Sequence, residues 1–116
     1  MFSFALASIP GPSSDSLDIA IVAKDNVVVK LDNEHIRVME ITLPAHSVGP
    51  LHWHPGHAVY YLTEAHLRNT PTDGAPILID VKPGDTTWTE TVTHVTENLG
   101  ANVAHFIMIE IRSAKR

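Results

Sequence analysis

Three histidines crowd into the seven-residue segment 51–57, which reads Leu-His-Trp-His-Pro-Gly-His. In an extended strand, residues two apart point to the same face, so His52 and His54 would present neighbouring imidazoles. Pro55 favours extended backbone at His54, and the Pro-Gly step can redirect the chain so that His57 faces the same interior. Imidazole is a usual nitrogen ligand for divalent transition metals. The spacing therefore predicts a metal site.

A further ligand would have to come from a distant part of the chain. The best candidate is His94, which lies in the strand-like run 92–97. His52, His54, His57 and His94 would make a set of three or four nitrogens that suits Fe, Mn, Ni, Cu or Zn, with room for water or substrate. The alternative is a solvated His-x-His face on an exposed strand, with Trp53 as the buried side; the nearby His57 and the distant His94 favour the metal.

The other four histidines are weaker candidates. His35 and His66 are expected at the surface. His46 lies in the loop 44–50, where it is either a plain loop histidine or a residue near the mouth of the site. His105 shares a strand face with apolar residues, which favours a core histidine over a ligand.

The elements that must position these side chains are strands. Val, Ile and Thr together make up more than a quarter of the chain, and such residues favour pleated, half-buried surfaces. Many short strands with regular turn signals predict an all-β sandwich or barrel. Strand-like runs cover residues 26–31, 35–43, 57–63, 67–69, 77–82, 86–89, 92–97 and 102–112.

Some details of these elements follow from local sequence. Lys82-Pro83-Gly84-Asp85 suits a type II turn, because proline sets the first central residue and glycine supplies positive φ at the second. Both faces of the run 102–112 are largely apolar, so this strand is expected to be covered on both sides. A little helix is expected within the first 25 residues or near 63–67.

Composition limits the function classes. The length of 116 residues favours one domain. Thirteen Asp and Glu against eight Lys and Arg leave a net charge of −5, and the basic residues are scattered, so nucleic acid is not an expected partner. No apolar run approaches the ~20 residues of a membrane span. The chain has no cysteine, which removes thiolate ligands and cysteine nucleophiles.

The first 25 residues are expected to form an N-terminal extension and linker, followed by a single domain over 26–116. Residues 2–9 are largely apolar, which favours a segment that packs on the domain or on a partner subunit over a secretory signal, because no basic residue precedes them. The acidic chain without a clear signal predicts a cytoplasmic location.

These residues resemble the two motifs of the cupin superfamily. Gly49, His52, His54 and the strand-like run 58–62 follow the order of the first motif, and Gly84, His94 and Asn98 follow that of the second. The resemblance covers about residues 34–112. It implies a small single-domain cupin with a double-stranded β-helix (jelly-roll) barrel, whose interior holds a metal and one small ligand. It also implies a homodimer.

The metal-binding glutamate of the first motif is absent. Counting back from Tyr61 and Leu62 places His57 at its position, which would give four histidine ligands. Counting forward from His54 places Ala58 there, and three ligands remain.

Two functions follow as expectations. The first is a metal-dependent, dioxygenase-like enzyme acting on a small organic molecule inside the barrel, with Tyr61 as a weak catalytic candidate and Glu90 or His46 as possible helpers at the mouth. Core packing is the alternative role for Tyr61. The second function is a non-catalytic module that binds or senses a small ligand with a structural metal, which the lack of an obvious acid or base favours.

Overall fold

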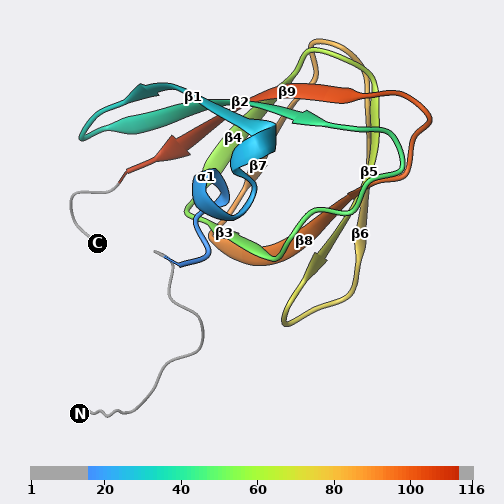
Figure 1. The fold of residues 1–116 in the computed structure, drawn as a ribbon, viewed down its shortest axis with the longest axis horizontal. Helices are drawn as coiled ribbons and strands as arrows, with labels where there is room; N and C mark the ends of the chain where they lie inside the picture. The colour runs from blue at the N-terminus through green and yellow to red at the C-terminus, as the bar shows by residue number, and fades with distance from the viewer. Residues whose placement is uncertain (1–15, 113–116) are drawn as a thin grey trace.

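The computed structural model describes residues 16–112 and consists almost entirely of strands (Figure 1). A short helix α1 (Ile19–Val22) and a 3-10 turn η1 (Lys24–Asn26) precede the strands. The strands are β1 (Val27–Asp32), β2 (Ile36–Leu43), β3 (His52–His54), β4 (His57–Tyr61), β5 (Ala65–Pro71), β6 (Ile77–Val81), β7 (Thr86–Thr89), β8 (Val92–Asn98) and β9 (Ala104–Ile111).

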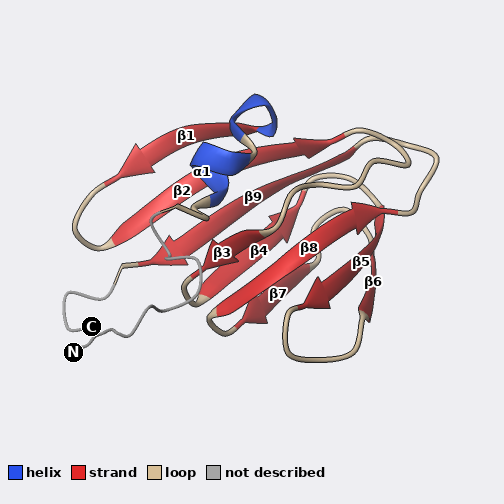
Figure 2. Ribbon diagram, turned by 60° about the horizontal axis from the view of Figure 1, so that its bottom comes forward, coloured by secondary structure: helices blue, strands red, loops and turns tan. Residues whose placement is uncertain are grey.

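The strands form two antiparallel sheets that face each other (Figure 2). The five-stranded sheet has the order β1-β2-β9-β4-β7, and the four-stranded sheet has the order β3-β8-β5-β6. Most neighbours in both sheets are far apart in the chain, so the connections cross repeatedly from one sheet to the other. The expected all-β barrel is confirmed. No helix in the described part of the chain is long and apolar enough to span a membrane.

Alternation along each strand builds the interior. On β9 the buried side chains are Ala104, Phe106, Met108 and Glu110, and the residues between them are half-buried or exposed. Because successive side chains point to opposite faces, one face of each strand supplies the core. The buried apolar side chains are Ile19, Met39, Ile41, Val59, Tyr61, Ala65, Leu67, Val81, Ala104, Phe106 and Met108.

The segment before β1 is fastened to the barrel at two points. The backbone N–H of Trp53 donates to the carbonyl of Leu17 at 2.8 Å, and Asp18 forms a parallel bridge with Trp53. Asp18 also caps α1, because its Oδ1 accepts from the N–H of Ala20 at 2.9 Å. The start of the described chain therefore lies along β3, the strand that carries His52 and His54.

Two turns follow their sequence signals closely. Gly84 has φ +91°, and the N–H of Asp85 donates to the carbonyl of Lys82 at 3.0 Å, as a type II turn requires. Gly56 lies against the indole of Trp88, where a Cβ would come within 2.9 Å of Cζ2. A side chain at position 56 would displace that ring, so glycine allows the turn between β3 and β4 to lie against Trp88 of β7.

One local expectation was met through one of its two alternatives, and another was only partly right. A helix does form in the first 25 residues, but the region 63–67 enters β5 at Ala65 and is not helical. Pairing of β5 with β6 and β8 on its two sides overrides the weak local preference. Strand β9 is fully buried on one face only, because its other face is open to solvent to varying degrees. The apolar run 2–9 lies outside the described residues.

Candidate metal centre

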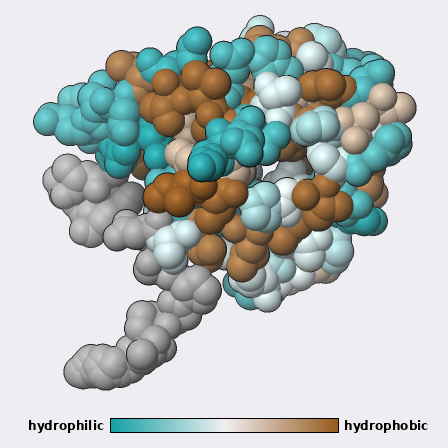
Figure 3. Space-filling view, in the orientation of Figure 1, coloured by the Kyte–Doolittle hydropathy of each residue, from teal (hydrophilic) through white to brown (hydrophobic). Residues whose placement is uncertain are grey.

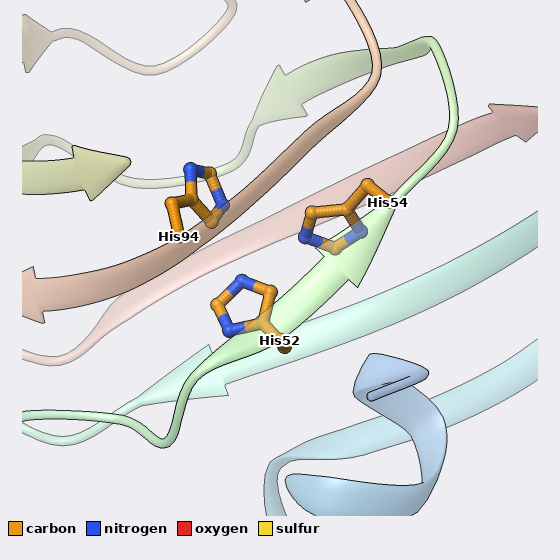
Figure 4. Close-up of side chains that lie close together, drawn as sticks. All are labelled: His52, His54 and His94. Carbon is orange, nitrogen blue, oxygen red and sulfur yellow. The ribbon is translucent and has the colours of Figure 1, made fainter. Parts of the chain in front are cut away.

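Two neighbouring strands bring three histidines together. His52 and His54 are the inward residues of β3, and His94 on β8 stands directly opposite His52 in the antiparallel register. All three side chains are buried, and one nitrogen from each lies within 4.8 Å of the other two. Figure 4 shows the three rings gathered around a common space.

Hydrogen bonds orient two of these rings for ligation. Nδ1 of His52 lies 2.8 Å from the carbonyl oxygen of Pro50, and Nδ1 of His54 lies 2.8 Å from Oε2 of Glu110. An oxygen acceptor at that distance requires the Nδ1–H tautomer, which leaves the lone pair on Nε2. Metal-binding histidines commonly donate their second ring N–H to a carbonyl or carboxylate in this way. His94 has no ring hydrogen bond in the part of the chain that the structure describes.

His57 approaches the same space from the other sheet. It begins β4, and its Nδ1–H donates to the carbonyl of Pro55 at 2.8 Å. The centroid of its ring lies 4.5 Å from that of His54. However, its nitrogens do not belong to the group within 4.8 Å, which contains His52, His54 and His94 among the described residues. The Pro55–Gly56 turn therefore returns His57 to the interior, beside the three-histidine group.

Burial keeps these imidazoles neutral. Desolvation lowers the pKa of His94 to about 3. The positive charge that His52, His54 and His57 would carry when protonated repels a proton on His94 and acts in the same direction. Burial likewise lowers the pKa of His52 and His57, and it lowers that of His54 well below its usual value. A neutral imidazole has its lone pair available, so at neutral pH no proton needs to be displaced before a metal binds.

The donor set fits a divalent transition metal. A metal at the usual ~2.0–2.1 Å from each nitrogen needs donor atoms roughly 3–4 Å apart, so modest ring rotations within the present group suffice. Three neutral nitrogens on one side of an ion leave coordination positions open on the other. Those positions would face the barrel interior.

A chain of buried charges continues from His54 away from the interior, and sequence reasoning missed it. Oε1 of Glu110 accepts from Nη2 of Arg37 at 2.8 Å and from Nε at 3.2 Å. Nη1 and Nη2 of the same guanidinium donate to the two carboxylate oxygens of Asp18 at 2.9 and 2.8 Å. Glu110 was visible as the one charged residue on the inward face of its strand, which was the available signal.

The pKa values in this chain reflect burial and pairing. Burial raises the pKa of Glu110, and the neighbouring Arg37 only partly offsets this. At Asp18 burial acts in the same upward direction, but the hydrogen bonds from Arg37 and from the N–H of Ala20 outweigh it and lower the pKa.

The three histidines open into a cavity of about 50 Å³, counted as the space available to the centre of a water-sized sphere. One water needs about 10–15 Å³ on this measure, so a few waters or one small molecule would fit. Ile41, Leu67, Phe106 and Met108 contribute apolar walls, and α1 contributes Ile19 at one side. None of the lining residues within 16–112 is Asp, Glu, Lys or Arg.

Tyr61 lines this cavity, as its shared strand face with His57 predicted. Burial raises the pKa of its hydroxyl, and the neighbouring Thr87 only partly offsets this. Its ring packs against Phe106 with centroids 5.4 Å apart. A buried ring packed against another aromatic ring matches the core-packing alternative for this residue.

The proposed helpers at the mouth do not line the cavity. Glu90 is exposed and accepts from Nε1 of Trp88 at 2.8 Å. His46 is exposed in its loop with φ 56°. Neither residue is placed to act on a ligand in the barrel.

The remaining histidines lie on the outside. His35 and His66 are exposed, as expected, and His66 is paired with Glu64 and Asp80. His105 was expected in the core, and that was wrong: it is half-buried on the outer face of β9, where Nε2 lies 2.5 Å from Oε2 of Glu40. Ile107 and Ile109, which share its face of β9, are likewise only half-buried.

Comparisons with known proteins were informative only at the level of structure. No family model matches the sequence, and no curated protein matches it. A cupin domain from Bordetella pertussis Tohama I is similar with a TM-score of 0.68 and 25% identity; the match covers 75% of this chain and 92% of that one.

Two further structures extend this likeness. An RmlC-like cupin family protein with a double-stranded β-helix fold from Methanocaldococcus jannaschii has a TM-score of 0.60 at 19% identity, over 77% of this chain and 83% of that one. Bacillus subtilis oxalate decarboxylase, a protein with Mn(II) centres, has a TM-score of 0.53 at 25% identity, over 66% of this chain but only 22% of its own.

Proposed function

The chain is a small single-domain cupin with a double-stranded β-helix fold, and we propose that it binds one divalent transition metal through His52, His54 and His94. The observation that carries the proposal is the arrangement of three buried imidazoles whose nitrogens lie within 4.8 Å of one another. Two of these rings are held with Nε2 free by acceptors on Nδ1. His57 is the candidate fourth ligand beside them.

The ligand of this metal is proposed to be a small organic molecule in the barrel cavity. Asn69 supports this, because its Oδ1 is the one buried side-chain polar atom without a hydrogen-bond partner in the described chain, and Asn69 lines the cavity. A buried unpaired acceptor costs about 1–3 kcal/mol, so such an atom calls for an explanation. A hydroxyl or N–H of a bound molecule, or an ordered water, would satisfy it.

Metal content is the first test. Purified protein reconstituted with Zn²⁺ or Mn²⁺ and then dialysed should retain about one ion per chain by elemental analysis. The double variant His52→Ala, His54→Ala should retain none, while His35→Ala, whose side chain is 77% exposed, should bind like the wild type. Equal metal content in the wild type and the double variant would refute the proposed site.

The second candidate function is dioxygenase-like oxidation of the bound molecule. The observation that favours it is the open side of a three-nitrogen site, since a metal held there can accept O₂ and a chelating substrate together. Against it stands the lack of Asp, Glu, Lys or Arg among the described residues that line the cavity. That feature favours a non-catalytic binding module.

Oxygen consumption separates the two. Protein loaded anaerobically with Fe(II) is mixed with air-saturated buffer and a panel of β-diketones, phenols and thiols. Substrate-dependent uptake that disappears in His94→Ala supports an enzyme. Binding of a panel member, seen as a perturbed metal spectrum without oxygen uptake, supports the binding module.

A further inference from the structure

The charged residues behind His54 form one connected unit. Starting at His54, the path runs through Glu110 and Arg37 to Asp18, and each link is a hydrogen bond of 2.8–2.9 Å. Arg37 and Glu110 are 7% and 3% exposed. Burying such charges is unfavourable unless they are paired and hydrogen-bonded, so the unit needs a reason for its position.

The net charge of this unit gives a reason for its buried position. Two carboxylates and one guanidinium leave a formal charge of −1 next to three neutral imidazoles. Interactions between charges are stronger in a poorly solvated interior than in water. A dication at the histidines would therefore be attracted by this unit, and Glu110 would make His54 a better electron donor by accepting its Nδ1–H.

The same unit holds the wall of the cavity beside the metal site. Asp18 caps α1, and the carbonyl of Asp18 accepts from the N–H groups of Ile21 and Val22 at 2.9 and 3.0 Å. Ile19, the first residue of α1, and Ala23, which directly follows the helix, line the cavity. Figure 1 shows α1 beside β3, between the two sheets.

Building on the proposed metal site, we infer that Glu110, Arg37 and Asp18 position His54 for the metal and fasten α1 to the same site. Glu110 and Arg37 are positioning residues, because Glu110 touches the proposed ligand His54 and Arg37 acts through Glu110. Asp18 links Arg37, and through it Glu110, to α1, the helix that borders the cavity. Metal binding should then stabilise α1, and a change that loosens α1 should lower the affinity for the metal.

The test compares this unit with a matched pair elsewhere. Arg68 and Glu97 form an ion pair of the same geometry, with Nη2 and Nε of Arg68 at 2.8 and 3.2 Å from Oε1 of Glu97. Both lie on the outer face of the four-stranded sheet. The variants are Glu110→Gln, Asp18→Asn, and the double variant Arg37→Met, Glu110→Gln, which removes the buried ion pair as a whole and leaves only the partly exposed carboxylate of Asp18. The control is Arg68→Met, Glu97→Gln.

Two readouts are needed, because a purely structural role would also lower stability. The first is Co²⁺ affinity by competition with a chelator, together with the visible spectrum of the Co²⁺ protein. Loss of an outer-shell partner typically weakens metal binding about 10- to 100-fold, and we expect this range for Glu110→Gln and for the double variant, with a shifted spectrum. The second is amide hydrogen exchange over residues 19–23, with and without metal.

In the wild type, Co²⁺ should slow exchange in α1, and this effect should be lost in Asp18→Asn. The control pair should match the wild type in affinity, spectrum and exchange. If the wild type binds Co²⁺ and both Glu110 variants bind it equally well with an unchanged spectrum, the positioning role is refuted while the proposed function stands. If folded wild type binds no Co²⁺, both fail together.

Discussion

His52 on β3 and His94 on β8 stand directly opposite each other in an antiparallel pair, with ring centroids 4.7 Å apart. Residues two apart on one strand share a face, so His54 joins this pair without any loop to position it. Sites built on strands are held more precisely than sites on loops. The three proposed ligands are therefore placed by the backbone pairing of two strands alone.

The first prediction separates a three-histidine from a four-histidine site. His57→Ala should keep about one metal per chain and lose less than about 10-fold in affinity, because the group of His52, His54 and His94 is complete without it. His94→Ala should lose more metal affinity than the ~10- to 100-fold that is typical when a hydrogen-bond partner of a metal ligand is removed. Elemental analysis and chelator competition measure both. If His57→Ala fails to retain metal as His94→Ala does, His57 is a ligand.

The grouping of His52, His54 and His94 was predictable from the sequence because it depends on a two-residue period and one strand pairing. The chain of charged residues formed by Glu110, Arg37 and Asp18 was not predictable. Arg37 and Glu110 are 73 residues apart, and no local pattern shows which distant strands become neighbours. A single glutamate near the end of an apolar strand also suggests a strand terminus more readily than a buried acceptor.

The outer face of β9 illustrates a second limit. Its apolar residues predicted coverage on both sides, whereas only the face with Phe106 and Met108 is fully buried. An apolar side chain can occupy a covered position, but the order of the strands in the sheets decides which positions are covered. His105 was misplaced for this reason.

The second prediction concerns acid stability of the metal-free protein. The pKa of His94 is about 3 when folded and about 6.5 when unfolded. Below pH 6.5 the unfolded chain takes up a proton that the folded chain refuses, so stability is full above this pH and falls as pH drops toward 3. His94 alone should remove about 2 kcal/mol between pH 6.5 and 5.

Urea unfolding at pH 7.5, 6 and 5 measures this slope. The lowered pKa values of His52, His54 and His57 act in the same direction and should steepen it. His94→Ala should flatten the slope, and the exposed His35→Ala should leave it unchanged. An identical slope in wild type and His94→Ala would show that His94 titrates normally in the folded protein.

The third prediction tests the expected homodimer. Figure 3 shows apolar surface on the side where α1 and β1 lie, and the exposed apolar residues of these elements are Ile21, Val28, Val29 and Leu31. β1 is also an edge strand of its sheet, and exposed apolar edges favour pairing with another chain.

Light scattering coupled to gel filtration should give twice the 12.7 kDa chain mass for the wild type and the single-chain mass for Val29→Lys. Ile77→Lys is the control, since Ile77 is 57% exposed on β6, the edge strand of the other sheet. A monomeric wild type refutes the dimer, and a dimeric Val29→Lys moves the interface away from β1.

The last prediction gives Asn98 a structural role. Its buried amide donates to the carbonyls of Leu43, Pro44 and Asn102 at 3.0–3.1 Å, and its Oδ1 accepts from the N–H of Gly100 at 2.9 Å. Asn98→Ala leaves four backbone groups without these bonds. Since an unpaired buried polar group costs about 1–3 kcal/mol, the free energy of unfolding should drop by about 3 kcal/mol or more. Metal stoichiometry of the folded fraction should stay at one, because Asn98 does not line the cavity.

Asn69→Ala is the matched control: it removes an amide whose oxygen is unpaired, so it should change stability far less. Equal losses in the two variants would show that the hydrogen bonds of Asn98 contribute little.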